Sequence, residues 1–293
     1  MKLTKLKGNS YYIDAFTNIG VYVNNGITTI IDCGLDNDSA MQIDETLQDN
    51  GLKVDNIIIT HAHADHIGGA KYFQDKYNTP VYSTMADTAI ANISIMNTSL
   101  IYGGMPTSTA KGKMLYANSC NATLLTEENL PDGLQVVDLK GHSISMIGII
   151  TSDNVLYCAD SFISEKTINK FPLTYILDIE QYFMSLDKIL QLNADYIVPS
   201  HSEVVTNATN IINLNKQAVL KNISDIYSVL LCPLEVSDIV YNYCKKFNYT
   251  LKTSQFFVAT TTVKNYLAYL EKTNKIISYV KNNRLYFEKV TTI

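Results

Sequence analysis

The chain is poor in several residue types, and each shortage narrows what the protein can be. It has a single arginine, Arg284, so almost no guanidinium is available to clamp carboxylates or phosphates through paired hydrogen bonds. Its five cysteines are odd in number and show no CxxC spacing, which favours free thiols over a disulfide framework. No stretch reaches the ~18 to 20 apolar residues that span a membrane, and the N-terminus lacks the apolar segment of a signal peptide. We therefore expect a cytoplasmic protein that does not enter a membrane.

The remaining composition is typical of a globular protein. Hydrophobic residues make up 46% and charged residues 17%, which supplies a sizeable core, and 293 residues suit one large domain followed by a small one. The formal net charge of -5 is unevenly spread. Residues 231–293 carry nine Lys plus Arg against four Asp plus Glu, or +5, so residues 1–230 carry -10. An acidic body disfavours a large polyanionic substrate there.

Histidine is also scarce, yet three of the five histidines lie within six residues, in the segment His61-Ala62-His63-Ala64-Asp65-His66. Neutral imidazole is a favoured ligand of zinc, iron and related ions, and carboxylates complete such sites. The β-branched run Ile57–Ile59 predicts a strand before this segment, and the residues after it can open a helix. His61 and His63 alternate, whereas Asp65 and His66 begin the next turn, so the geometry favours two adjacent metals. A polar strand end with incidental histidines is the competing interpretation, and the density of histidine disfavours it.

The other two histidines and one aspartate also follow apolar runs. His142 comes after residues 134–139, His201 ends the stretch 196–201, and Asp160 ends the stretch 155–160. Open α/β layers place ligand sites where strands end, because loops from distant sequence positions converge there. We therefore expect these residues to join the first three histidines at one site.

Together these stretches resemble the metallo-β-lactamase superfamily, whose pattern is HxHxDH, then GH[ST], then an Asp after a strand, then PxH. The resemblance covers nearly all of residues 1–230 and implies an α/β fold, an αββα sandwich, as the catalytic domain. It implies two divalent metal ions, zinc foremost, with iron or manganese as alternatives. The implied ligands are His61, His63 and His142 for one metal and Asp65, His66 and His201 for the other, with Asp160 bridging.

The sequence departs from the family pattern at four positions without losing a ligand. Proline often stands where Lys140 is, and glycine often stands where Ser145, Ala159 and Ser202 are. The segment Asp32-Cys33-Gly34 matches the family's Asp-x-Gly strand end, where the carboxylate braces the metal loops. A simple capping role for Asp32 is an equal alternative.

The resemblance implies hydrolysis by a metal-bound hydroxide. Two metals ~3.5 to 4 Å apart lower the pKa of a shared water from ~15.7 to about 7 and polarise the oxygen of the bond to be cleaved. Asp65 is the predicted catalytic residue, because it would bind metal and orient the water or relay a proton. The favoured substrate is a small ester, thioester or lactone, as in glyoxalase II-like proteins. The shortage of arginine disfavours glutathione itself as the thiol carrier.

Two other functions compete with this prediction. The first is a nuclease or phosphodiesterase whose C-terminal module contacts nucleic acid. The second is a non-hydrolytic member, such as a dioxygenase or an oxygen-reducing di-iron protein. His63 disfavours the di-iron protein, because such proteins usually carry Glu at that position.

Residues 84–121 lack a regular apolar pattern for much of their length. Residues 87–96 predict a helix, and residues 101–109 predict a loop. Loops of this length are often lids or binding loops, so we predict a lid over a substrate pocket. The candidate substrate contacts are Tyr102, Met105, Lys111, Lys113 and Tyr116. A helical insertion that packs on the body or on a second subunit is the alternative.

Cys232-Pro233 predicts a domain boundary, since proline resists helix continuation. Residues 231–293 predict two helices, over 236–247 and ending at 272, followed by a β-hairpin over 276–280 and 285–290. This order resembles a winged helix. The charge of +5 leaves nucleic-acid contact open, yet a winged fold also serves dimerisation or substrate framing. We therefore favour a role in a homodimer or in shaping the pocket for a small-molecule substrate.

Overall fold

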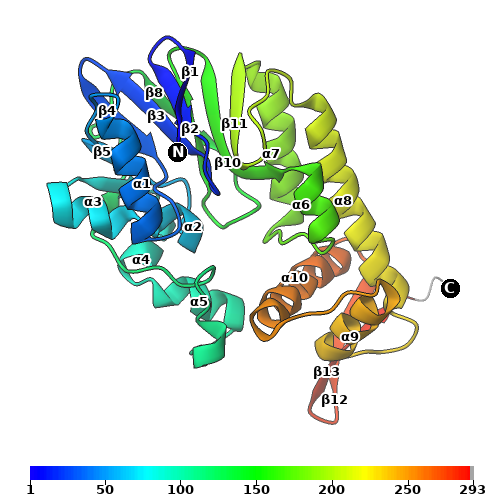
Figure 1. Cartoon of the computed structure of the whole chain (residues 1–293). Helices are drawn as coiled ribbons and strands as arrows, with labels where there is room; N and C mark the ends of the chain where they lie inside the picture. The colour runs from blue at the N-terminus through cyan, green and yellow to red at the C-terminus, as the bar shows by residue number, and fades with distance from the viewer. Residues whose placement is uncertain (291–293) are drawn as a thin grey trace.

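The protein is described here by a computed structural model, which covers residues 1–290 (Figure 1). Two β-sheets pack face to face in its main body, and helices cover both outer faces. Figure 1 shows α1 (Asn37–Gln48) and α3 (Ala70–Tyr77) on one side, and α7 (Ile179–Leu192) and α8 (Thr209–Val229) on the other. This order of layers is the predicted αββα sandwich. Residues 291–293 of the predicted C-terminal module lie outside the described residues.

The first sheet has seven strands in the order β1-β2-β3-β4-β5-β6-β7. Pairing is antiparallel from β1 to β4 and parallel from β4 to β7. The strands are β1 (Leu3–Lys7), β2 (Ser10–Ile13), β3 (Ile19–Asn24), β4 (Ile27–Ile31), β5 (Asn56–Ile58), β6 (Val81–Ser83) and β7 (Ala122–Leu124). The sequence did not predict β1, because this edge strand, Leu3-Thr4-Lys5-Leu6-Lys7, lacks a regular apolar alternation and buries none of its residues fully.

The second sheet has four strands in the order β11-β10-β9-β8. Its strands are β8 (Leu134–Asp138), β9 (Ile147–Thr151), β10 (Val155–Ile163) and β11 (Tyr196–His201), of which β10 and β11 run parallel. Residues 141–146, between β8 and β9, form a loop closed by hydrogen bonds from Gly141 N to Ser143 O and from Leu139 N to Met146 O.

The other helices of the body are α2 (Ala64–Ile67), α4 (Met85–Asn92), α5 (Ile95–Tyr102), α6 (Glu165–Lys170) and the 3-10 turn η1 (Ser108–Ala110). The helix predicted over residues 87–96 is divided in two, because the backbone at Ile93 leaves the helical region with φ -127° and ψ 68°. Helix α5 then runs into the predicted loop. It ends at Gly103, whose φ of 81° is the left-handed conformation that glycine adopts most readily.

The space between the two sheets is filled by apolar side chains from both. Buried residues of β3, β4 and β5 meet those of β8 to β11, and they include Tyr22, Ile58, Ile149, Tyr157 and Val198. The Tyr157 hydroxyl donates to Tyr11 O at 2.7 Å and to Val21 O at 3.1 Å, so it ties the second sheet to the first. Full burial of each large apolar side chain contributes roughly 1.5–3 kcal/mol.

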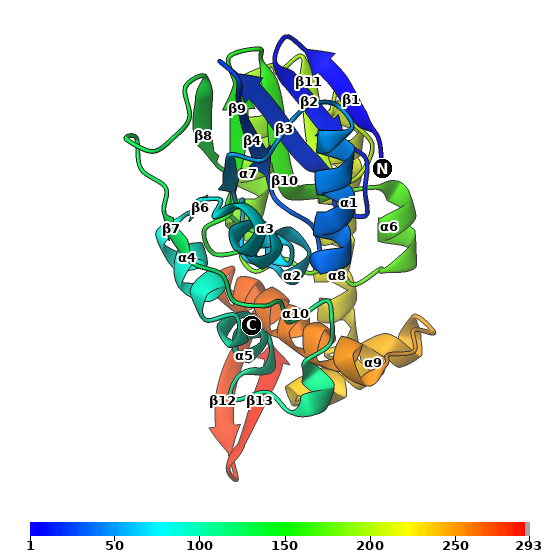
Figure 2. The same ribbon diagram turned by 60° about the vertical axis from the view of Figure 1, so that its left-hand side comes forward.

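The C-terminal region consists of α9 (Val236–Lys246), α10 (Thr253–Lys272) and the hairpin β12 (Ile276–Lys281) and β13 (Arg284–Lys289). Figure 2 shows α10 below the sandwich and the hairpin extending away from it. Buried residues of α10, such as Tyr266 and Leu267, share one core with Leu186 of α7 and Ile212 of α8. The predicted boundary at residue 231 therefore falls in a continuous core. Within residues 1–290 the chain contains no helix with the length and apolarity needed to cross a bilayer.

Candidate metal centre

The seven predicted ligands meet at one edge of the sandwich: four lie in the loop after β5 and in α2, and three come from the second sheet, where Asp160 lies within β10 and not at its end. The loop after β5 carries His61 and His63 and leads into α2 with Asp65 and His66. The other three come from the second sheet, from the loop after β8, from β10 and from the end of β11: His142, Asp160 and His201. The two sheets thus bring together residues that lie up to 140 positions apart in the sequence.

One group comprises His61, His63, His142 and Asp160, whose ligand atoms all lie within 4.8 Å of one another. His63 Nδ1 is 3.0 Å from His61 Nε2 and 2.9 Å from His142 Nε2. Asp160 Oδ2 is 3.3 Å from His142 Nε2 and 3.9 Å from His61 Nε2. Ligand atoms around a tetrahedral zinc ion with bonds of about 2.0–2.1 Å are roughly 3.3 Å apart. The spacing of this group suits one such ion.

The second group comprises Asp65, His66 and His201. Asp65 Oδ2 is 2.9 Å from His201 Nε2 and 3.8 Å from His66 Nε2. Asp160 completes this group through its other oxygen, because Oδ1 is 3.3 Å from His66 Nε2 and 3.5 Å from His201 Nε2. Asp160 therefore turns one oxygen to each group. The division into two groups is the one that the resemblance implies.

Two atoms of this centre are buried and lack a hydrogen-bond partner among the described residues: His66 Nε2 and Asp160 Oδ1. An unsatisfied buried polar atom costs about 1–3 kcal/mol, and more when it is charged. A divalent cation placed between these atoms would satisfy both. The donor set of imidazoles and carboxylates therefore fits a pair of metal ions.

Burial is the dominant influence on the first group. It lowers the pKa of His61 and His63 and takes the pKa of His142 to about 3. These imidazoles are neutral near pH 7, which is the protonation state that binds metal.

The carboxylates prevail in the second group. Burial lowers the pKa of His66, but the nearby Asp160, Asp32 and Asp65 raise it well above its usual value. Burial lowers the pKa of His201 as well, but the nearby Asp160 and Asp65 raise it to about 9. Protons on these imidazoles balance the carboxylates when no cation does, and metal binding must displace them.

Asp32 braces the metal loop from beneath, as one of the two predicted roles requires. Its carboxylate accepts hydrogen bonds from Thr60 N and Thr60 Oγ1, each at 2.8 Å, and its Oδ2 is 2.7 Å from His66 Nδ1. A proton on Nδ1 that is donated to Asp32 leaves the lone pair of Nε2 facing the second group. The bracing role of Asp32 is therefore confirmed.

Sequence reasoning missed a second brace, Asp87. This buried carboxylate accepts from Ala62 N at 2.9 Å in the metal loop and from Thr84 Oγ1 at 2.8 Å at the start of α4. The Ser145 hydroxyl, in the loop that carries His142, donates to the same carboxylate. The Thr84-x-x-Asp87 spacing signals a helix start, but nothing in the sequence shows that its carboxylate reaches two metal loops.

Two backbone features shape the centre. Gly68 and Gly69 let the end of α2 lie against the loop that connects β4 to α1. A Cβ on Gly68 would stand 1.8 Å from Leu35 O, and one on Gly69 would stand 2.2 Å from Cys33 O. Ala159, next to Asp160, has a φ of 51°, in the left-handed region where a Cβ costs roughly 1–2 kcal/mol. This is a position where the family often has glycine.

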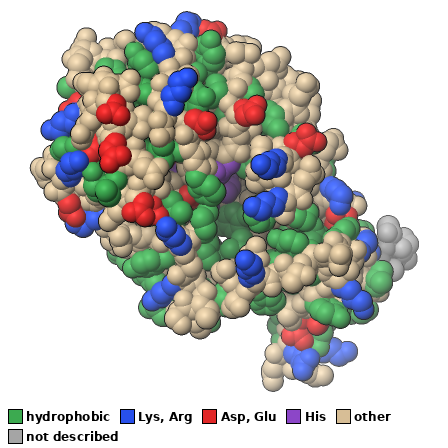
Figure 3. Space-filling model, in the orientation of Figure 1, with side chains coloured by type: hydrophobic (Ala, Val, Ile, Leu, Met, Phe, Trp, Pro, Cys, Tyr) green, Lys and Arg blue, Asp and Glu red, His purple; other side chains and the backbone are tan. Residues whose placement is uncertain are grey.

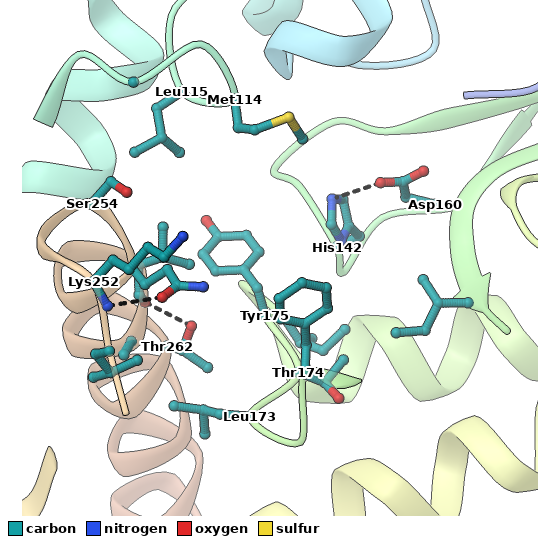
Figure 4. A pocket seen from close by; sticks show the side chains of 18 of the residues that line it. Met114, Leu115, His142, Asp160, Leu173, Thr174, Tyr175, Lys252, Ser254 and Thr262 are labelled. Atoms are coloured by element: carbon teal, nitrogen blue, oxygen red, sulfur yellow. Dashed lines mark hydrogen bonds and ion pairs between the residues drawn. The ribbon is translucent and has the colours of Figure 1, made fainter. Parts of the chain in front are cut away.

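A pocket of about 500 Å³ opens beside the first group (Figure 4). His142 and Asp160 line the end near the metal ligands, and the remaining wall comes mainly from residues 112–115, residues 171–176 and residues 249–262. The ring of Tyr175 packs edge-on against His63 and His142, with ring centres 5.9 Å and 5.7 Å away. Helix α10 thus forms part of the pocket, which is one of the two roles predicted for the C-terminal region.

The five predicted substrate contacts occupy different places. Only Lys113 lines this pocket, and its ammonium forms an ion pair with Asp36. Tyr102 packs on Phe257 of α10 with ring centres 5.0 Å apart. The other three are exposed outside the pocket wall: Met105, Lys111 and Tyr116. Figure 3 shows the histidines at the base of a hollow in the surface of the molecule.

Comparison with known proteins gives the chain its relatives. The model of the metallo-beta-lactamase superfamily matches residues 12–201. The probable metallo-hydrolase YqjP of Bacillus subtilis is 23% identical over 303 aligned residues, which cover 94% of each chain. A hydroxyacylglutathione hydrolase of Pectobacterium atrosepticum is 26% identical over 170 residues, 56% of this chain and 54% of that one.

Solved structures agree with these sequence matches. A beta-lactamase domain protein from Burkholderia ambifaria superposes with a TM-score of 0.73 at 16% identity, over 98% of this chain and 93% of that one. A metallo-beta-lactamase family protein from Thermus thermophilus superposes with a TM-score of 0.70 at 15% identity, over 94% of both chains. The fold thus extends over nearly the whole chain. Because the family model covers well over half of the sequence and the ligand groups are in place, the chain belongs to the metallo-β-lactamase superfamily and is a metal-dependent hydrolase.

Proposed function

We propose that this protein hydrolyses a small ester, thioester or lactone by means of two divalent metal ions, with zinc as the first candidate. One observation carries the proposal. Two ligand groups that share Asp160 stand at the end of a bounded pocket of about 500 Å³, whose wall is mostly apolar. Pockets of ~300–1,000 Å³ enclose a whole small molecule. A site of this size suits a small carbonyl compound better than a segment of a polymer.

Each residue of the centre has a proposed task. When bound, the two cations supply Lewis acidity and lower the pKa of water from ~15.7 to about 7. Asp65 accepts a hydrogen bond from Thr17 Oγ1 at 3.1 Å and faces His201, so it is the proposed ligand that also orients water or relays a proton. His201 is held by a hydrogen bond from its Nδ1 to Phe16 O at 3.1 Å, which leaves Nε2 free for the second group.

The charges around the pocket favour a carbonyl substrate over a phosphodiester. Lys113 and Lys252 are the cations among the lining residues, and Lys113 is already paired with Asp36. The similarity to a hydroxyacylglutathione hydrolase supports a thioester, but a single arginine leaves few groups to bind glutathione carboxylates. We therefore propose that the substrate is a thioester of another thiol carrier, an ester of an alcohol, or a lactone.

A metal-dependent nuclease or phosphodiesterase is the second candidate. It is favoured by the +5 charge of residues 231–293 and by the order of two helices and a hairpin, which we propose to be a winged-helix-like module. Yet Arg284, at the turn of the hairpin, pairs with Glu235 at 3.0 Å rather than standing free. We propose that this region frames the pocket and supports a homodimer in the cytoplasm.

An activity panel on metal-reconstituted protein separates the two candidates. It should contain thioesters, lactones and bis(p-nitrophenyl) phosphate, with His61→Ala as the control that removes a proposed ligand. We expect turnover of a thioester or lactone that is lost in His61→Ala. Cleavage of RNA or of the phosphodiester alone would reverse the assignment. Tight binding of tRNA whose steep salt dependence disappears in a Lys264, Lys281 and Arg284 to Ala variant would overturn the role proposed for residues 231–293.

A further inference from the structure

We propose that the pocket beside the metal centre binds the uncharged hydrocarbon chain of an acyl substrate, and that α10 limits the length of that chain. This inference rests on the proposed function and names its substrate class: a thioester or ester with a saturated acyl chain. Its hydrolysis consumes one water, breaks the bond between the acyl carbon and sulfur or oxygen, and releases a carboxylic acid and a thiol or alcohol. The acyl carbonyl lies at His142 and Asp160, and the chain extends from there toward α10.

The occupant is indicated by the apolar part of the pocket wall, which includes Phe171, Leu173, Ile176, Leu251, Val258 and Ala259. The two halves of this wall come from the segment after α6 and from the region around the start of α10. Figure 4 shows α10 on the left, His142 and Asp160 on the right, and Leu173 and Tyr175 between them in this view. A chain that extends from the metal ligands toward α10 therefore passes these side chains.

Two of the polar side chains around this wall are already committed elsewhere. The Thr262 hydroxyl donates to Val258 O at 2.8 Å, within α10. The Gln255 side-chain oxygen accepts from Lys252 N at 2.8 Å and caps the helix. The Thr174 hydroxyl, by contrast, lines the pocket and is buried without a hydrogen-bond partner among the described residues. A ligand here gains chiefly by burying hydrocarbon, and Thr174 offers it one hydrogen bond.

Charge argues against an anionic tail in the pocket. Lys113 is neutralised by Asp36, and Lys252 is exposed at the start of α10. A carboxylate taken into the wall would lose its hydration without a buried cation to replace it. An uncharged chain meets no such cost.

The volume sets the length of the chain. At about 30 Å³ for each water-sized group, which is also roughly the size of a methylene, the pocket of about 500 Å³ has room for roughly 17 such groups. That is enough for the carbonyl group, the atoms of the leaving group next to it and an acyl chain of roughly ten carbons. Ala259 is buried in α10 at this wall, where its small side chain leaves the space for the chain.

The absence of tryptophan from the sequence allows a direct binding test. In Phe171→Trp the new indole lines the pocket and is the only tryptophan of the full-length protein. Phe256→Trp is the matched control, because Phe256 is similarly exposed, at 41% against 38% for Phe171, and does not line the pocket. The probes are straight-chain amides from acetamide to dodecanamide, whose unactivated amide bond resists hydrolysis during a titration, and a decanamide that carries a terminal carboxylate.

We expect the fluorescence of Phe171→Trp to shift in a saturable way, with an affinity that rises up to roughly fourfold per methylene until about ten carbons. The Phe256→Trp protein should not respond. No response in Phe171→Trp, an equal response in both variants, or tighter binding of the carboxylated amide would each overturn the inference. Since nothing is hydrolysed, this result is independent of whether the proposed function is correct.

The length limit has its own test. Ala259→Phe should fill the end of the pocket and shift the best acyl thioester toward shorter chains, so turnover of decanoyl thioester should fall by a much larger factor than turnover of acetyl thioester. Ala268→Phe, on the exposed face of α10, is the matched control and should leave the chain-length profile as it is. If the unmodified protein hydrolysed acetyl and decanoyl thioesters at equal rates, the inference about the acyl chain would be wrong. The proposed function would not be affected.

Discussion

The metal centre and the wall of its pocket lie side by side but are built in opposite ways. The centre is assembled from polar residues at strand ends, and its buried atoms are braced by carboxylates such as Asp32 and Asp87. The wall comes from helix α10 and from segments without a motif, and its side chains do little beyond burying surface. The difference separates chemistry from specificity: one region fixes which bond is attacked, and the other fixes which molecule fits.

The largest effect on the metal centre is expected from replacing Asp160. Replacement by Ala removes a carboxylate that turns one oxygen to each ligand group, so metal content should fall from about two equivalents to well below about one. Elemental analysis after desalting measures this. Asp138→Ala, at an exposed carboxylate on β8 that pairs with Lys140, should retain both metals. If Asp160→Ala kept one tightly bound equivalent, the carboxylate would belong to a single group.

The brace at Asp32 should have the next largest effect. Asp32→Asn keeps the size of the side chain but no longer holds the His66 proton on Nδ1. We expect metal affinity at the second group to fall by about 10–100-fold, with the first group less affected, as competition with a chelator would measure. Asp55→Asn, whose carboxylate accepts from Thr28 N in β4, is the control. An equal loss at both groups would show that Asp32 supports the whole loop and not His66 alone.

This comparison also explains what the sequence could predict. The ligand histidines occur in short segments after apolar strands, and the chemistry of imidazole limits what such segments can do. The pocket wall has no such signal, because Leu173, Leu251 and Val258 are ordinary core-type residues until the fold places them opposite His142. The predicted contacts were sought in residues 84–121, yet helix α5 packs there on α10 through Tyr102 and Phe257. Long-range packing decided the wall, and local sequence carries little information about it.

A smaller effect separates the two lysines that were predicted to bind substrate. Lys113 lines the pocket and pairs with Asp36, so Lys113→Ala should loosen residues 112–115 and raise KM by roughly two- to fivefold through the loss of this exposed ion pair. Lys111→Ala, outside the wall, should leave KM nearly unchanged. Steady-state kinetics on the best ester or thioester measures both. Equal effects of the two changes would restore the predicted pair of anchors.

The smallest expected effect is on stability. Ala159 adopts a φ of 51°, and Ala159→Gly removes a Cβ from that conformation, which should stabilise the fold by about 0.5–1 kcal/mol after the entropic cost of glycine is included. Urea unfolding of the metal-free protein measures the change. Ala194→Gly, at a buried position without a positive φ, should destabilise the protein by a similar amount. A loss of stability in Ala159→Gly would mean that the methyl group contributes more through packing than it costs in strain.

We propose that the seven ligand residues form a single centre for two metal ions, joined by Asp160. The direct test is to titrate the metal-free, full-length protein with zinc. Elemental analysis then measures the bound metal, and hydrolysis of the best thioester or lactone measures the activity. We expect two bound equivalents of zinc per chain, and full activity only when close to two equivalents are bound. Saturation at one equivalent with full activity, after zinc, manganese and iron have each been supplied, would contradict it.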